Sequence, residues 1–354
     1  MKKSFTVLVW VLLSIVPFVS RSQVYFLNED FSTATGSTPP AGWSNNTLSG
    51  DPSFDVWVFD NPGFRDAYAP MSDPVAIFDS DLFSSGGGAE DVTLESPSFN
   101  TTGYTTITLK FDQYFEEGFG GNGSVEVWDG SSWDVVYSNS FYTANPEEQV
   151  IDISAQAANK TGVKIRFRWE GDYAWWWIID NVQVLYKSDI EVTSVKMKNS
   201  VCGSNNEQVI VTLKNNSYSS KTNIPVTVQT TGAISSTANT TYTRTLPAQA
   251  TDTISVYIGN TFVGGTVTNK ATASLAGDNA PANDTLSRVD VIVGTPAPPS
   301  GVDGQNCGIG SVNLAGTNSV ATDSLVWFDA SSGGPLLGVG NSFKTPVINT
   351  TTPF

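Results

Sequence analysis

Alternating hydrophobic and polar positions predict β-strands along most of this chain. The clearest case is residues 163–169, whose letters VKIRFRW alternate apolar with basic side chains. A period of two places the apolar side chains on one face of a strand and the charged ones on the other. Similar segments recur between turns rich in glycine, proline and asparagine, and no helical periodicity persists. The pattern predicts an all-β chain.

The segment 169–186, WEGDYAWWWIIDNVQVLY, predicts the closing strand of the first β-domain. Counting with period two from Trp176 puts Ile178 and Val182 on one face, and Asp180 falls on that same apolar face. A bare carboxylate is costly to bury, so we expect something to neutralise it. A bound cation is one candidate. A hydrogen-bonded acid without metal is the other.

The opposite face of this predicted strand carries Trp175, Trp177 and Ile179. Aromatic faces often form the floor of a carbohydrate site, so Trp175 and Trp177 are candidate ligand-binding residues. The same tryptophans could close the core of a two-sheet sandwich. The pattern leaves both interpretations open.

The segment VYFLNEDF at 24–31 has a similar character. Tyr25, Leu27 and Phe31 share a face with Glu29 at period two. Glu29 is therefore a second acid expected among large apolar neighbours.

Strand spacing divides the chain into modules. About ten short strands over residues 23–187 suit a β-sandwich of jelly-roll type. Residues 188–294 have the spacing of an Ig-like sandwich. The Pro-rich segment 295–301 predicts a linker, and residues 302–354 open a further module.

The beginning of the chain predicts export. A basic start, an apolar run over 5–19 and a small-x-small signal at 20–22 predict a signal peptide over residues 1–22, cleaved before Gln23. An uncleaved anchor is the alternative. No later apolar stretch is long enough for a membrane helix, so we expect no membrane insertion of the mature chain.

Charge and composition narrow the function further. The formal net charge of −16 repels nucleic acid and anionic lipid and favours calcium outside the cell. Histidine is absent, which excludes Ser-His-Asp and Cys-His catalysis and histidine-ligated zinc. The two cysteines, Cys202 and Cys307, lie far apart, so no disulfide framework is expected.

Several motifs occur in an order that resembles a known family. They are NEDF at 28–31, PAGW at 40–43, LESP at 94–97, TITLKFDQYF at 106–115, VEVW at 125–128 and WIIDNV at 177–182. Together they resemble the MAM-like "choice-of-anchor J" or cleaved-adhesin jelly rolls of secreted Bacteroidetes-type proteins. The chain departs from animal MAM domains in lacking their cysteines.

This resemblance implies a structural calcium where the first strand meets the last. Glu29 and Asp180 would be its ligands, with Asp79 or Asp81 from the acidic loop as further ligands. Carboxylate and carbonyl oxygens are the ligands that calcium prefers. For Asp79 and Asp81 a solvated Asp-rich turn is the alternative.

The later modules resemble two further families. Residues 213–217 (LKNNS) and 277–285 (GDNAPANDT) look like bacterial cell-adhesion-related Ig-like modules, which implies spacers. Residues 302–354 resemble Ig-like repeats near the C-terminus of type IX secreted proteins. Such repeats continue beyond the point that matches Phe354 and hold a partner for Cys307, so we expect this module to be incomplete and the chain to be a fragment.

These observations lead to a non-catalytic adhesion or binding protein, secreted or on the cell surface. A calcium-stabilised jelly-roll head would bind an extracellular glycan or surface protein, and the Ig-like modules would be spacers. One alternative is a carbohydrate-binding accessory region of a larger secreted hydrolase or peptidase, with Trp175 and Trp177 as its platform. Another is an enzyme that uses Glu29 and Asp180 as paired carboxylates. The sequence leaves the oligomeric state open.

Overall fold

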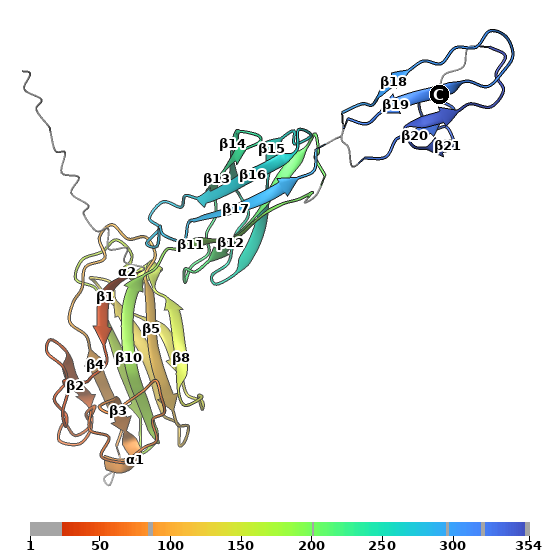
Figure 1. Cartoon of the computed structure of the whole chain (residues 1–354). Coiled ribbons are helices and arrows are strands. Elements are labelled where there is room, and N and C mark those ends of the chain that lie inside the picture. Colours follow the sequence, from red (N-terminus) through yellow and green to blue (C-terminus); the bar gives the residue numbers. More distant parts are fainter. Residues whose placement is uncertain (1–22, 84–87, 200–201, 295–296, 320–322, 351–354) are drawn as a thin grey trace, which may run out of the picture.

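The computed structural model describes residues 23–83, 88–199, 202–294, 297–319 and 323–350. The predicted signal peptide, residues 1–22, lies outside the described residues. Strands dominate these ranges, which confirms the all-β prediction (Figure 1). The helices in them, α1 (Ser80–Phe83) and α2 (Ser154–Ala157), are four residues long. Within these ranges no helix has the length and apolar character needed to span a membrane.

Residues 24–186, called the head below, form a sandwich of two five-stranded sheets. In the first sheet the order is β1 (Val24–Glu29), β10 (Trp176–Tyr186), β5 (Thr108–Phe115) and β8 (Glu147–Asp152), and β3 (Ala76–Asp79) also pairs with β10. In the second sheet the order is β2 (Ser44–Ser49), β4 (Glu90–Glu95), β9 (Lys164–Gly171), β6 (Asn122–Trp128) and β7 (Trp133–Asn139).

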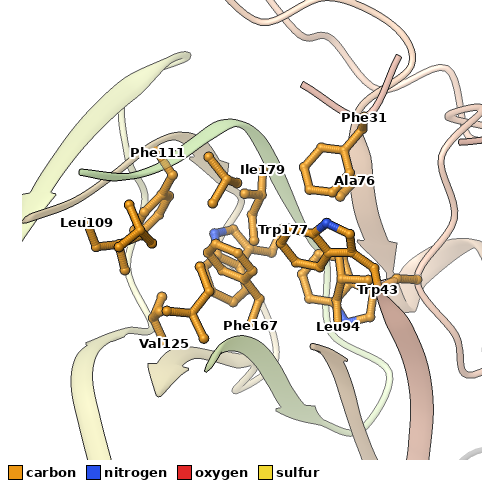
Figure 2. Packing of buried hydrophobic residues seen from close by; sticks show 14 of the residues in the cluster. Phe31, Trp43, Ala76, Leu94, Leu109, Phe111, Val125, Phe167, Trp177 and Ile179 are labelled. Atoms are coloured by element: carbon orange, nitrogen blue, oxygen red, sulfur yellow. The ribbon is translucent and has the colours of Figure 1, made fainter. Parts of the chain in front are cut away.

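Trp177 lies in the centre of the core between the two sheets (Figure 2). Its side chain is 0% exposed, and its ring centroid lies 5.7 Å from that of Trp57 and 5.8 Å from that of Phe167. The Trp177 Nε1–H donates a hydrogen bond to Gln113 Oε1 (3.0 Å). The indole N–H is therefore satisfied in an otherwise apolar environment, as a buried tryptophan requires.

A β-bulge interrupts β10. Its register with β5 runs to Asp180 opposite Asp112 and resumes at Gln183. Asn181 has a φ of 53°, in the left-handed region that asparagine tolerates. A bulge adds one residue to one strand, so side chains beyond it change face. Val182 therefore joins the core on the side of Trp177, and the predicted grouping of Val182 with Trp176 and Ile178 was wrong.

One edge of β10 is shared by two strands. β3 pairs with Trp176 to Ile179, and β1 pairs with Val182 to Tyr186. Asp180 and Asn181 lie between these pairings. Residues 70–72, from the long connection between β2 and β3, contact the strand at this point through the hydrogen bonds described below.

The second module is also a sandwich with its own apolar core. One sheet has the order β11 (Ile190–Met197), β12 (Glu207–Asn215) and β15 (Thr251–Gly259). The other has the order β14 (Ser236–Tyr242), β13 (Ile224–Gly232), β16 (Gly265–Ala273) and β17 (Thr285–Ile292).

Residues 300–344 contain two small sheets. They are formed by β18 (Ser300–Val302), β19 (Asn313–Thr317) and β22 (Ser342–Lys344), and by β20 (Val326–Phe328) with β21 (Leu336–Val339). Stacked rings of Trp327 and Phe343, 5.7 Å apart, join the two sheets. Cys202 and Cys307 are exposed free thiols.

We expect Trp177→Ala to lower the free energy of unfolding of the head by about 3 to 5 kcal/mol, because it opens a cavity between the sheets. Phe141→Ala is the matched control, since Phe141 is 67% exposed, and it should change stability by less than about 0.5 kcal/mol. Urea denaturation followed by circular dichroism measures both. Equal effects of the two substitutions would contradict this placement of Trp177.

Candidate functional site

Asp180 is a buried carboxylate held by backbone N–H groups. Its residue is 1% exposed. The Ser72 N–H donates to Oδ2 (3.0 Å), and the Asn181 N–H donates to Oδ1 (2.7 Å). Both oxygens therefore have a donor, and the Ser72 bond fastens the β2–β3 connection to the interruption of β10.

A second buried carboxylate lies on the neighbouring strand. Asp112 of β5 is the register partner of Asp180 and is 7% exposed. The Asn181 Nδ2–H donates to Asp112 Oδ2 (2.8 Å) and to the Pro70 carbonyl oxygen (3.2 Å). The bulge residue thus links the acid on β5 to the segment that covers the gap.

No lysine or arginine of the described ranges forms a salt bridge with Asp180 or Asp112. Burial raises the pKa of Asp180 to about 6, against the bonds from Ser72 and Asn181 and with help from the negative charge of Asp30 and Asp112. Burial also raises the pKa of Asp112, opposed by its bond from Asn181. Within the described residues, the pair is therefore not neutralised by an ion pair.

Glu29 lies at the end of β1, with Val182 as its register partner. Its Oε1 accepts a hydrogen bond from the Phe31 N–H (2.9 Å). Burial raises the pKa of Glu29, and the bond from Phe31 opposes that shift. Glu29 is therefore next to Asp180 and Asn181, the residues of β10 between its pairings with β3 and β1. Its carboxylate is hydrogen-bonded to the turn that follows β1.

Asp79 and Asp81 bind an arginine. Arg65 Nε and Nη2 donate to the two oxygens of Asp79 (2.7 and 3.0 Å), and Nη2 also donates to Asp81 Oδ2 (2.7 Å). The guanidinium carbon lies 3.9 Å from the centroid of the Trp176 ring. Asp79 is the register partner of Trp176, the first residue of β10, and Trp176 comes four residues before Asp180.

The structure thus does not gather the predicted ligand set of Glu29, Asp79, Asp81 and Asp180 at one point. In the described part of the chain no group of three or more acid, cysteine or histidine side chains is placed to hold a metal ion. The charge of Asp180 and Asp112 fits a cation, but backbone carbonyls such as that of Pro70 or water would have to supply further oxygen ligands.

The predicted sugar platform is not formed. Trp177 belongs to the core, as shown above. Trp175 is partly buried and packs on Trp176 with ring centroids 5.2 Å apart. Gly118 approaches its other side so closely that a Cβ at that position would overlap the indole. The five-membered ring of Trp175 is therefore in contact with the β5–β6 loop.

Other aromatic side chains, which the sequence analysis did not select, are exposed. They lie on four connections called the distal loops below: residues 50–75, 116–121, 140–146 and 172–175. Their exposed fractions are 92% for Phe64, 79% for Phe119, 67% for Phe141, 60% for Tyr142, 56% for Tyr68 and 50% for Tyr173. Phe64 and Phe119 each follow a glycine in a turn, a local signal that could have indicated exposed loop aromatics.

We expect the unfolding free energy of the head to fall as pH rises from about 4 to beyond 6. The folded-state pKa of Asp180 is about 6 and thus above its ordinary 3.8, so folding favours the protonated acid. This stabilisation of the folded state is fully present below the unfolded-state pKa of Asp180. Up to about 3 kcal/mol of it is lost as pH rises and Asp180 ionises in the folded state. Urea denaturation in the presence of chelator measures it. Asp180→Asn should flatten the profile, and an unchanged slope would contradict this assignment.

Comparison with known proteins gives one family match. Residues 296–354 match the family described as Ig-like domain, CHU_C associated. This agrees with the predicted Ig-like character of the last module. No curated protein matches this chain.

Among solved structures, this chain is similar over part of its length to cleaved adhesin domains of Lys-gingipain from Porphyromonas gingivalis W83. The K3 domain matches at 18% identity and a TM-score of 0.36 over 46% of this chain and 98% of that domain. The K1 domain matches at 16% identity and 0.34, over 45% and 96%. TmCBM61 in complex with beta-1,4-galactotriose matches at 18% and 0.32, over 46% and 99%. Similarity at this level does not identify a function for this chain.

Proposed function

We propose that this chain is an exported, non-catalytic binding protein whose head binds an extracellular glycan or surface protein. The observation that carries the proposal is the position of the distal loops. The chain leaves the head through Tyr186 at one end of β10, whereas the distal loops adjoin Trp176 at the other end (Figure 1). A partner can therefore reach the loops without meeting the second module.

Contacts at the junction support a spacer role for the second module. The Tyr186 hydroxyl donates to the Gly277 carbonyl oxygen (3.0 Å). The ring of Tyr218 lies 5.3 Å from Lys110 Nζ and 5.5 Å from Lys187 Nζ. Each of these contacts joins the head or its exit to the second module, so they restrict the direction in which the distal loops point.

The chemistry of the acids supports a non-catalytic role. General acid–base work needs a titratable group that reaches substrate. Asp180 and Asp112 are buried and accept hydrogen bonds from the backbone of Ser72 and Asn181 and from the side chain of Asn181. The chain also has no histidine. The enzyme alternative based on Glu29 and Asp180 receives no support from this arrangement.

The accessory carbohydrate-binding alternative loses the platform on which it was based. Trp177 is enclosed, and Trp175 is partly buried between Trp176 and Gly118, so the two do not form a shared exposed platform. A glycan partner would have to bind through other side chains, and the exposed aromatics of the distal loops are the available ones.

We expect the mature chain, residues 23–354, to bind members of a panel of soluble polysaccharides and purified extracellular proteins without altering them. Biolayer interferometry measures binding, and reducing-end and peptide-release assays on the same samples measure turnover. Binding to none of the panel would count against the proposal. Turnover that disappears in an acid-to-amide variant would replace the non-catalytic function with an enzymatic one.

We further propose that a calcium ion stabilises the head at Asp180, with Asp112 as its neighbouring carboxylate and Glu29 at the adjacent strand end. The support is electrostatic, since buried like charges without a counter-cation are costly and a divalent cation would offset that cost. Oxygen ligands are the ones that calcium accepts.

On this proposal, millimolar calcium raises the melting temperature of the wild type above its value in chelator, because the ion binds the folded state alone. A shift of roughly 4 °C or more corresponds to about 1 to 2 kcal/mol for a domain of this size. Asp180→Asn should abolish the shift, and Asp81→Asn should keep it. Differential scanning fluorimetry measures all three, and an absent shift in the wild type would refute the calcium site.

A further inference from the structure

Hydrogen bonds join the distal loops to one another and to the beginning of β10. The Asn145 Nδ2–H donates to the Asp66 carbonyl oxygen (2.8 Å), and the Tyr68 N–H donates to Asn145 Oδ1 (3.3 Å). These bonds join the loops 50–75 and 140–146. The loop after β5 is joined to the beginning of β10 by the Glu116 N–H, which donates to the Trp176 carbonyl oxygen (3.0 Å).

Several aromatic side chains of this surface are held outward by the backbone. Phe64, Phe119 and Tyr173 have φ values of 52°, 55° and 49°. Bulky residues rarely adopt this left-handed conformation, and each instance costs on the order of 1 kcal/mol. The conformation buries no ring in return, since Phe64 and Phe119 are the most exposed aromatics of the head. A cluster of this kind marks an interaction surface.

The charge of the same loops is almost wholly negative. Their one basic residue is Arg65, which is already bound to Asp79 and Asp81. The acids on the distal loops are Asp51, Asp55, Asp60, Asp66, Asp73, Glu116, Glu117 and Asp172. Glu116 is buried, whereas the other acids are at least partly exposed. A partner that covers the aromatic rings must approach those carboxylates, so a cationic partner is favoured over an anionic one.

Arg65 shows how this surface holds a cation. Its guanidinium lies over the ring of Trp176 while two carboxylates accept its N–H groups. Cation–π attraction and charge-assisted hydrogen bonds act together in such an arrangement.

Two tyrosines at this end of the head hydrogen-bond to carboxylates, the exposed Tyr68 and the partly buried Tyr114 of β5. The Tyr68 hydroxyl donates to Asp66 Oδ2 (3.2 Å), and Tyr114 donates to Glu116. Carboxylates are thus held beside the rings of Tyr68 and Tyr114.

We propose that the distal loops bind a basic segment of a protein partner, with lysine or arginine side chains on the exposed rings and their charges on the neighbouring carboxylates. This inference rests on the proposed binding function and names the chemistry of the partner. Phenyl rings contact the alkyl stems of such side chains, and the acids select the charge.

The test uses the mature chain and three probes: a peptide of alternating Arg-Gly and Lys-Ser units, its Glu-for-basic counterpart, and soluble β-1,4-galactan. The basic peptide should bind, and its affinity should fall as sodium chloride increases. Phe64→Asn with Phe119→Asn should weaken it about tenfold or more, because asparagine keeps the left-handed backbone and removes the ring. Tyr257→Ser, at a residue 54% exposed on β15, is the matched control and should leave binding unchanged.

A second pair of variants separates local recognition from the charge of the whole chain. Asp66→Asn with Glu117→Gln should weaken peptide binding, while Asp303→Asn with Asp323→Asn removes the same charge from the last module and should not. Equal losses in both pairs would overturn the proposal, because they would indicate non-specific attraction. Absence of basic-peptide binding would also overturn it.

Galactan binding that depends on Phe64 and Phe119, without peptide binding, would show that the surface takes a glycan. In that case the basic-partner inference fails and the broader binding function stands. Failure of every probe, together with no binding to the wider panel, would remove both.

Discussion

The interruption of β10 is the feature on which the structure of the head depends. β10 pairs with β5 along one edge. Along its other edge it pairs first with β3 and then with β1, so that edge must fit two separate registers. Asn181 makes this possible by adopting a left-handed conformation and donating across the gap. The bulge then directs Val182 to the core side, where Trp177 fills the space between the sheets.

The same interruption creates the buried carboxylate pair. Asp180 accepts hydrogen bonds from two backbone N–H groups at the gap, that of Ser72 in the β2–β3 connection and that of Asn181 in β10. Burying a second acid, Asp112, beside it adds repulsion that hydrogen bonds only partly offset. The stability of the head therefore depends on the protonation of this pair, which lies beside residues 70–72 of the distal loop 50–75.

The two ends of the head differ in their contacts. At one end Tyr186 and Lys187 contact the second module. At the other, strained aromatic residues and carboxylates face solvent with Arg65 as a built-in example of a bound cation. The close-packed core lies between these two ends, and β10 runs from one to the other. This separation of the two ends is what supports the proposed binding function.

The sequence by itself determined the all-β class, most strand positions and the burial of Asp180, because alternation with period two is a local property of neighbouring residues. It could not reveal the bulge at Asn181, since one extra residue changes the face of every later side chain without changing the composition. It also could not show that Arg65 would engage Asp79, or that the loops of Phe64 and Phe119 would lie at the same end of the head. Those relations join loops that are distant in the chain, and only the tertiary pairing of the strands brings them together.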